Sequence, residues 1–134
     1  MATWDDVNRL VMAMPGTEQI REREWRAGAR SSVFERPLRA RDLAEIGDQA
    51  GPILGARVAD EGEKLALIES DPDVFFTTSH FDGYPVVLIH LDRISPERLA
   101  EVVVEAWIAT APKRAVQAYA RSAQGSPFGA RDGG

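Results

Sequence analysis

The first apolar residues of the chain recur at helical spacing. They stand three or four positions apart on one face of a helix, and they are Trp4, Val7, Leu10, Val11 and Met14. Thr3 and Asp6 form a capping-box pattern at the start of this stripe, and Pro15-Gly16 follows it. The pattern predicts a first helix that packs its apolar stripe against the core.

Residues 17–36 change to a short, extended pattern. Gly28 is the only strong turn residue between residues 24–27 and 31–35, which predicts a hairpin. Pro37 ends the second strand, because proline lacks the amide donor that a central strand position needs.

A further strand and a short helix are predicted in the middle of the chain. After one or two helical turns near residues 43–46, the run at 53–58 alternates, with Arg57 on one face and three apolar residues on the other, namely Leu54, Ala56 and Val58. A second capping pattern at residues 60–63 opens a helix in which one face is shared by Leu65 and Ile68.

The densest apolar stretch runs from Asp71 to Asp92 and contains both histidines. Residues 74–78 and 86–91 are its most β-prone runs, and we expect them to be neighbouring strands around the turn signal Asp82-Gly83. The connection, Thr77 to Pro85, is longer than a tight hairpin loop, so we expect it to display side chains.

The last helical pattern begins at Ser95-Pro96-Glu97, which supplies an N-cap, a proline and an acid in the first turn. Its apolar face consists of Leu99, Val102, Val103, Ala106 and Trp107. Ala111-Pro112 interrupts the helix, and residues 113–122 can resume it. We expect a single domain over residues 1–123 and a disordered tail over residues 124–134.

Composition narrows the class of protein. With 134 residues, 44% hydrophobic and 28% charged, the chain fits one ordinary globular domain. No apolar run approaches the roughly 18 residues that a membrane helix needs, and the N-terminus lacks the pattern of an export signal. Without cysteine there are no disulfides or thiolates. We therefore expect a cytoplasmic protein with no membrane partner.

The net charge of −5 argues against indiscriminate binding to nucleic acid, since lysine and arginine supply that affinity. Residues 21–41 nevertheless carry seven arginines against three glutamates, and residues 113–134 carry four basic residues against one aspartate. One interpretation is a surface for single-stranded nucleic acid, formed by Arg21, Arg23, Trp25, Arg26 and Arg30. The other is that Trp25 packs into the core and the arginines form a solvated rim.

Several blocks of sequence carry a resemblance to a known family. They are Phe75-Phe76-Thr77-Thr78, His80 through Pro85 with the strand at 86–91, Asp92-Arg93, Ala106-Trp107, Ala111-Pro112-Lys113-Arg114, Met14-Pro15-Gly16, residues 34–38 and residues 58–64. On these residues, and over most of residues 3–120, the chain resembles the MmcQ/YjbR family, although Ser79 stands where proline is common in the family.

The resemblance implies a compact α+β fold in the order helix, three strands, helix, two strands, helix. It also implies an antiparallel sheet packed by helices, similar to secretion chaperones. The family is often labelled DNA-binding, so the resemblance makes nucleic acid the leading partner. Such a fold analogy does not itself establish a function.

The two histidines stand in a repeated His-x-Asp pattern, at residues 80–82 and 90–92. In an extended chain both members of each pair face the same way, so the pairs could gather around one metal, but no thiolate or helical histidine pair accompanies them. Adjacency of Ser79 and His80 does not make a triad, and no nucleophile elbow or phosphate-binding glycine loop is present. The sequence predicts no catalytic residue, metal or cofactor, while an acid or base role for His80 stays open.

A binding groove is the remaining interpretation. If the last helix packs across the sheet, its tryptophan converges with the aromatic and hydroxyl side chains of the Thr77 to Pro85 loop, and basic residues at the helix end attract an anion. The candidates are Phe76, Thr78, His80, Tyr84, Trp107, Lys113 and Arg114. Alternatively, Trp107 is an ordinary core residue. The sequence thus predicts a binding module rather than an enzyme, whose partner is nucleic acid, a small anionic ligand or another protein.

Overall fold

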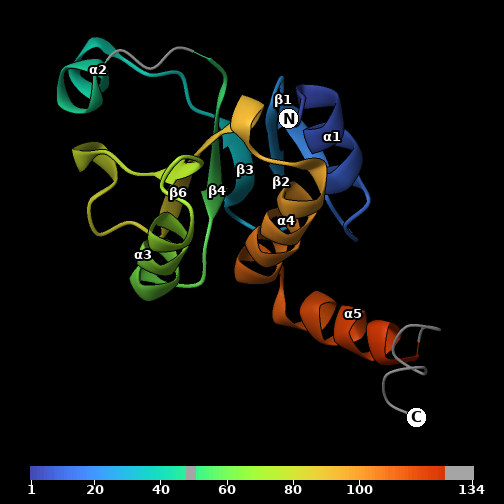
Figure 1. Ribbon diagram of the computed structural model, residues 1–134. Helices are drawn as coiled ribbons and strands as arrows, with labels where there is room; N and C mark the ends of the chain where they lie inside the picture. Colours follow the sequence, from blue (N-terminus) through green and yellow to red (C-terminus); the bar gives the residue numbers. More distant parts are fainter. Residues whose placement is uncertain (48–50, 126–134) are drawn as a thin grey trace.

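One antiparallel sheet organises the described part of the chain, residues 1–47 and 51–125 of the computed structural model (Figure 1). Within those residues the sheet has six strands in the order β1-β2-β3-β4-β6-β5. Their bounds are β1 Glu18–Arg21, β2 Glu24–Arg26, β3 Ser31–Glu35, β4 Ile53–Arg57, β5 Phe75–Phe76 and β6 Val86–His90. Neither β4 nor β6 is an edge strand, and all of their residues except Arg57 are buried, which suits their mainly apolar sequences.

The helices begin where capping residues predict them. Their bounds are α1 Trp4–Met12, α2 Ala40–Ile46, α3 Glu61–Ser70, α4 Pro96–Thr110 and α5 Lys113–Gly125, with short 3-10 turns at η1 Ser79–Phe81 and η2 Leu91–Arg93. The Thr3 hydroxyl accepts a hydrogen bond from the Asp6 N–H at 3.2 Å, and the Asp6 carboxylate accepts one from the Thr3 N–H at 2.9 Å. At α3 and α4 a single cap bond is present: the Asp60 carboxylate accepts from the Glu63 N–H at 2.9 Å, and the Ser95 hydroxyl accepts from the Arg98 N–H at 3.1 Å. The predicted starts of these three helices are confirmed.

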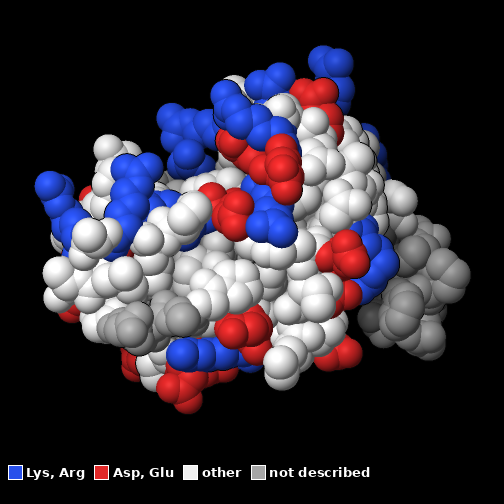
Figure 2. All heavy atoms as spheres, turned by 90° about the horizontal axis from the view of Figure 1, so that it is seen from above, with Lys and Arg blue, Asp and Glu red and all other residues white. Residues whose placement is uncertain are grey.

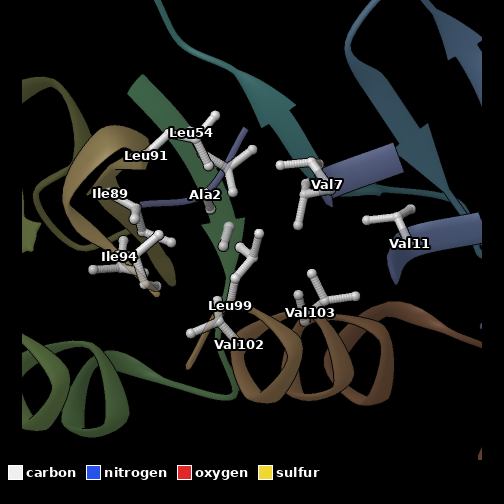
Figure 3. Packing of buried hydrophobic residues seen from close by; sticks show 14 of the residues in the cluster. Ala2, Val7, Val11, Leu54, Ile89, Leu91, Ile94, Leu99, Val102 and Val103 are labelled. Atoms are coloured by element: carbon white, nitrogen blue, oxygen red, sulfur yellow. The ribbon is translucent and has the colours of Figure 1, made fainter. Parts of the chain in front are cut away.

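The main core lies between one face of the sheet and the helices α1 and α4. In Figure 1, α4 crosses the strands, and it contacts β3, β4 and α1. Figure 3 shows how apolar side chains fill the space between these elements; they include Val7, Val11, Leu54, Ile89, Leu99, Val102 and Val103. Trp25 and Trp107 belong to the same core and are each 1% exposed. Removal of this apolar surface from water is the main stabilising contribution.

The opposite face of the sheet is only partly covered. A second apolar cluster lies there, made of Ile53, Phe81, Val86 and Leu88 with Phe34, Leu38 and Phe76 packed against it. The Phe34 ring lies over β4 because its partner in that strand is Gly55: a Cβ on Gly55 would come within 2.6 Å of the ring. On β2, strand alternation directs Glu24 and Arg26 to this face, since Trp25 between them points into the core.

The fold is α+β, as predicted, but several local predictions are corrected. A strand, β1, precedes the hairpin across a turn at Arg23, whose φ is 61°, so the stretch before Trp25 is not a single strand. The strand predicted at 74–78 shortens to β5. In α3 the buried side chain is that of Lys64, whereas Leu65 is 54% exposed. The helices α2 and α5 are additional to the order that the resemblance implies.

The tail predicted at residues 124–134 lies outside the described residues, except that residues 124 and 125 end α5. In the described part of the chain, no helix has the length and apolar character needed to cross a membrane.

Gly28 provides a test of how the sheet is joined to α4. A Cβ at this position would lie 2.0 Å from the carbonyl oxygen of Thr110, at the end of α4. Because that oxygen is a backbone atom, the clash could be relieved only by moving the backbone at residue 28 away from α4. We expect Gly28→Ala to lower the free energy of unfolding by about 1–3 kcal/mol, measured by urea denaturation.

Gly62→Ala is the matched control, because an added methyl group within α3 meets only a side-chain oxygen of Asp60, at 3.3 Å. Helix propensity favours alanine there by about 1 kcal/mol, so this variant should be no less stable than the parent. Equal losses for the two variants would contradict the proposed contact at Gly28.

Candidate functional site

The candidate site is a pocket on the partly covered face of the sheet, which we call the sheet pocket. Strand alternation sends Leu54 and Ala56 of β4 into the main core and Arg57 to the opposite face. Arg57 is paired there with Val86 of β6. The sheet pocket has a volume of about 330 Å³ and is lined by Phe34, Arg57, His80, Phe81, Tyr84 and Val86.

Arg57 gives the sheet pocket its chemical character. Its side chain is partly buried, and its Nε atom has no hydrogen-bond partner among the described residues. The ion pairs found in residues 1–47 and 51–125 do not include Arg57. Burial lowers the pKa of Arg57 from its ordinary value, and the positive charge of Arg30 lowers it further. A guanidinium keeps its charge in proteins, so this pocket contains a cation without a counterion.

Two neighbouring hollows contain further arginines and share residues with the sheet pocket. The Arg30 hollow, about 400 Å³, is lined by Arg30 and Arg57 together with small and apolar residues. The α2 hollow, about 360 Å³, is lined by Arg36, Arg39, Arg41, Asp42 and His80. The sheet pocket shares Arg57 with the first and His80 with the second. From above, Figure 2 shows basic side chains gathered along one edge of the molecule, with acidic side chains interspersed toward the centre.

The acid in the α2 hollow is already paired. Asp42 is 3% exposed, and its carboxylate accepts hydrogen bonds from the Arg39 N–H at 2.9 Å and from the Arg36 guanidinium at 3.2 Å. The backbone hydrogen bond from Arg39, with the charge of Arg36 beside it, holds the pKa of Asp42 below its ordinary value against the opposing effect of burial. Arg36 is thereby neutralised, while Arg39 and Arg41 are exposed.

A buried lysine positions the wall of the sheet pocket. Lys64 of α3 is 1% exposed, and its Nζ donates hydrogen bonds to the carbonyl oxygens of Phe81 at 2.7 Å and Tyr84 at 3.1 Å. The carboxylate of Glu61 lies 3.7 Å from the same Nζ. A buried ammonium group needs such acceptors, so the interaction ties the turn that follows η1 to α3.

A glutamate holds the other end of the same wall. The Glu45 carboxylate of α2 accepts hydrogen bonds from the Ser79 N–H at 3.0 and 3.1 Å and from the Ser79 hydroxyl at 2.8 Å. Residues 79–84, which carry His80 and Tyr84, are therefore fixed from α2 and from α3.

The predicted ligand-binding residues divide between the two faces of the sheet. His80 and Tyr84 line the sheet pocket, and Tyr84 is 59% exposed. Phe76 stacks on His90, with ring centroids 4.4 Å apart, and Thr78 is 1% exposed just before η1. Neither of these two residues lines the sheet pocket.

The predicted convergence of Trp107 with the loop aromatics does not occur. Trp107 lies in the main core, where its Nε1 donates a hydrogen bond to the Pro15 carbonyl oxygen at 2.9 Å and its ring contacts Tyr119. The sheet separates Trp107 from Phe81 and the second cluster. Lys113 and Arg114 are exposed at the start of α5 and line none of the three hollows described above. The alternative in which Trp107 is a core residue is the correct one.

Most of the predicted nucleic-acid residues are also committed elsewhere. Trp25 is buried and donates a hydrogen bond from Nε1 to Asn8 at 3.1 Å, so it presents no face to a base. The three arginines nearest to Trp25 in the sequence form ion pairs with glutamates. The pairs are Arg21–Glu24, Arg23–Glu35 and Arg26–Glu18. Arg30 forms no ion pair with a described residue.

The two histidines have different environments. His90 is 2% exposed, and burial, with the charge of Arg93, lowers its pKa, so it is neutral near pH 7. His80 is exposed at the edge of the sheet pocket. Over residues 1–47 and 51–125, no group of three His, Cys, Asp or Glu side chains is arranged to hold a metal ion, so the two His-x-Asp pairs do not form a common site there.

Three residues that shape the site were missed from the sequence. The alternation of the strand placed Arg57 on the face opposite its apolar residues but did not mark it as a binding residue. The signal that could have identified it is an arginine as the last residue of an otherwise apolar strand. Lys64 and Glu45 gave no such signal, because their partners are 17 and 34 positions away in the chain.

Comparison with known proteins gives relatives but no activity. The chain is 48% identical over 124 residues to the uncharacterized proteins Rv2570 and MT2646 of Mycobacterium tuberculosis and Mb2600 of Mycobacterium bovis, covering 89% of this chain and 96% of each relative. No family model matches the chain. The crystal structure of Deinococcus radiodurans protein DR2400, a DUF419 domain, is similar in fold, with a TM-score of 0.59, 18% identity, and coverage of 96% of this chain and 91% of that chain.

Lys64→Met tests the wall of the sheet pocket. The variant removes the donor to two carbonyl oxygens, and a buried acceptor left without a partner costs about 1–3 kcal/mol. We expect faster hydrogen exchange at the amides of residues 79–86 and a lower free energy of unfolding, with the amides of β3 and β4 still protected. Lys113→Met is the control, because Lys113 is the other lysine of the chain and its side chain is exposed. This variant should alter neither the hydrogen exchange nor the free energy of unfolding. Unchanged exchange in Lys64→Met would show that the lysine does not hold this segment.

Proposed function

The chain belongs to the same family as these uncharacterized mycobacterial proteins, and we propose that it binds a small anionic ligand with an apolar or aromatic part in the sheet pocket. The observation that carries the proposal is the partly buried Arg57, whose Nε has no partner among the described residues. A half-buried cation without a counterion has lost part of its hydration, and a bound anion would compensate for that loss.

The other lining residues suit the organic part of such a ligand. Phe34, Phe81 and Val86 provide apolar walls, and Tyr84 adds an exposed ring. A pocket of about 330 Å³ is at the lower end of the range for small-molecule sites, roughly 300–1,000 Å³. Walls of this kind with one convergent cation are typical of ligand sites in which the charge fixes orientation.

A hollow between α3 and α4 fits a ligand less well. It is lined by apolar residues and by Glu63, Glu101 and Glu105, with Arg98 as its basic member. Its volume is about 50 Å³, and Arg98 already pairs with Glu101 at 3.1 Å. It therefore lacks both the space and the unpaired charge of the sheet pocket.

The proposal predicts binding of benzoate or phenyl phosphate, measured by titration of the ¹⁵N-labelled protein followed by NMR. We expect chemical-shift changes at the amides of Phe34, Arg57, His80 and Tyr84. Arg57→Gln should weaken binding by about 10-fold or more, because a charge-assisted hydrogen bond contributes about 1.5–3 kcal/mol.

Arg121→Gln is the control with the same change of charge, since Arg121 is exposed on α5 and lines none of the described hollows. Both variants are first checked for an unaltered unfolding transition. If neither probe binds, or if the two variants weaken binding equally, the sheet pocket is not an anion site.

A second candidate function is binding of single-stranded nucleic acid, in a chain of the MmcQ/YjbR type. The specific observation in its favour is that the sheet pocket, with the exposed Tyr84 ring, shares residues with two hollows, and the three together contain Arg30, Arg57, Arg39 and Arg41. A basic groove with an aromatic side chain is the pattern that tracks a phosphate backbone and stacks a base. The resemblance to the family extends to the Phe76 to Pro85 block, which includes residues of the pocket wall.

The salt dependence of affinity separates the two candidates. A short single-stranded oligonucleotide that contacted these four arginines would lose affinity with a slope of about −3 in log affinity against log salt. The double variant Arg39→Gln, Arg41→Gln should reduce that slope by about half, whereas Arg21→Gln, which removes a side chain paired with Glu24, should change it little. An absence of binding at low salt would eliminate this candidate.

A further inference from the structure

Arg30 stands next to Arg57 on a fixed piece of backbone. The connection that carries it packs at Gly28 against the end of α4, where there is no room even for a Cβ. Arg30 and Arg57 both line the Arg30 hollow, and the charge of Arg30 acts on the guanidinium of Arg57. Arg30 is exposed, but its backbone position places its positive charge within electrostatic reach of Arg57.

Among the described residues, no acid lines the Arg30 hollow. Apart from the two arginines, its lining residues are alanine, valine, proline and threonine. Neither arginine forms an ion pair within the described residues. The hollow borders the C-terminal end of α4 at Thr110, whose helix dipole contributes about half a negative charge. Two full positive charges outweigh it, so the site keeps a positive charge of more than one.

Arg57 also lines the sheet pocket, so the two cavities meet at its side chain. An anionic group held by Arg57 and Arg30 can therefore belong to a molecule whose organic part lies against Phe34 and Tyr84. A single negative charge between the two guanidinium groups would leave a net charge of +1, whereas a doubly charged anion would balance both groups. A tetrahedral dianion can accept hydrogen bonds from both groups.

We propose that the ligand of the sheet pocket is a phosphate monoester, bound as its dianion between Arg57 and Arg30 with its organic group in the sheet pocket. This inference rests on the proposed function, since it specifies the anion that the pocket takes. In this proposal Arg57 binds an anionic group whether it carries one or two negative charges. Arg30 makes a group with two negative charges bind more tightly than a group with one.

The test compares phenyl phosphate with benzenesulfonate, which has the same ring and a tetrahedral group with a single negative charge. Both are titrated into the full chain at about pH 8, where a phosphate monoester has lost its second proton, whose pKa is about 6. The ionic strength is held constant because exposed charges are screened by salt. We expect phenyl phosphate to bind about 10-fold more tightly than benzenesulfonate.

Variants assign the preference to a residue. Arg30→Gln should reduce the preference for phenyl phosphate to about twofold or less while changing benzenesulfonate affinity by no more than about threefold, since exposed charge pairs contribute about 1 kcal/mol or less. Arg30→Lys should retain most of the preference, because a point charge is sufficient for it. Arg57→Gln should weaken the binding of both compounds, and Arg121→Gln should leave the ratio unchanged.

The outcomes distinguish the two levels of the proposal. If both compounds bind through Arg57 with equal affinity, or if Arg30→Gln leaves their ratio intact, the inference about the dianion is overturned and anion binding in the sheet pocket stands. If benzoate binds but neither of these compounds does, the inference alone is overturned. If benzoate does not bind either, the proposed function fails and the inference fails with it.

Discussion

The alternation of side chains along β4 is the constraint on which the rest of the structure depends. This strand pairs with β3 along one edge and with β6 along the other, and its two faces lie against the main core and the second apolar cluster. Leu54 and Ala56 point to the main core, and Gly55 and Arg57 point to the opposite face. A slip of one residue would exchange these sets and bury a guanidinium beneath α4. The same register that completes the core therefore also places the one charged residue of the strand in the sheet pocket.

The sheet pocket itself depends on contacts from outside the sheet. Its wall, residues 79–84, contains little regular structure and is held by Lys64 from α3 and by Glu45 from α2. A lysine at 1% exposure is costly to bury, and backbone carbonyl acceptors make it tolerable. Because one ammonium group binds two carbonyl oxygens, a single side chain fixes the backbone of this wall at both Phe81 and Tyr84.

Whether an arginine of this protein can bind an anion depends on whether its guanidinium is already paired with a carboxylate. Arg21, Arg23 and Arg26 each lie within 3.1 Å of a glutamate, so the hairpin that is richest in arginine offers little free charge. Arg30 and Arg57, by contrast, have no described counterion. An ion pair on the surface adds little stability, but it does occupy the donors that an anionic ligand would need. Arg30 and Arg57 thus keep donors that the arginines of the hairpin have already used.

The sequence by itself determined the local elements: the starts of α1, α3 and α4, the β2–β3 hairpin, the pairing of β5 with β6, and the α+β class. Those features follow from caps, turns and periodicity, which act over a few residues. Only the tertiary structure decided that Trp25 and Trp107 are buried, that Lys64 reaches Phe81, and that Arg30 meets Arg57. Each of these features brings together residues that are distant in the sequence. Local sequence patterns do not indicate which distant residues will become neighbours in the folded chain.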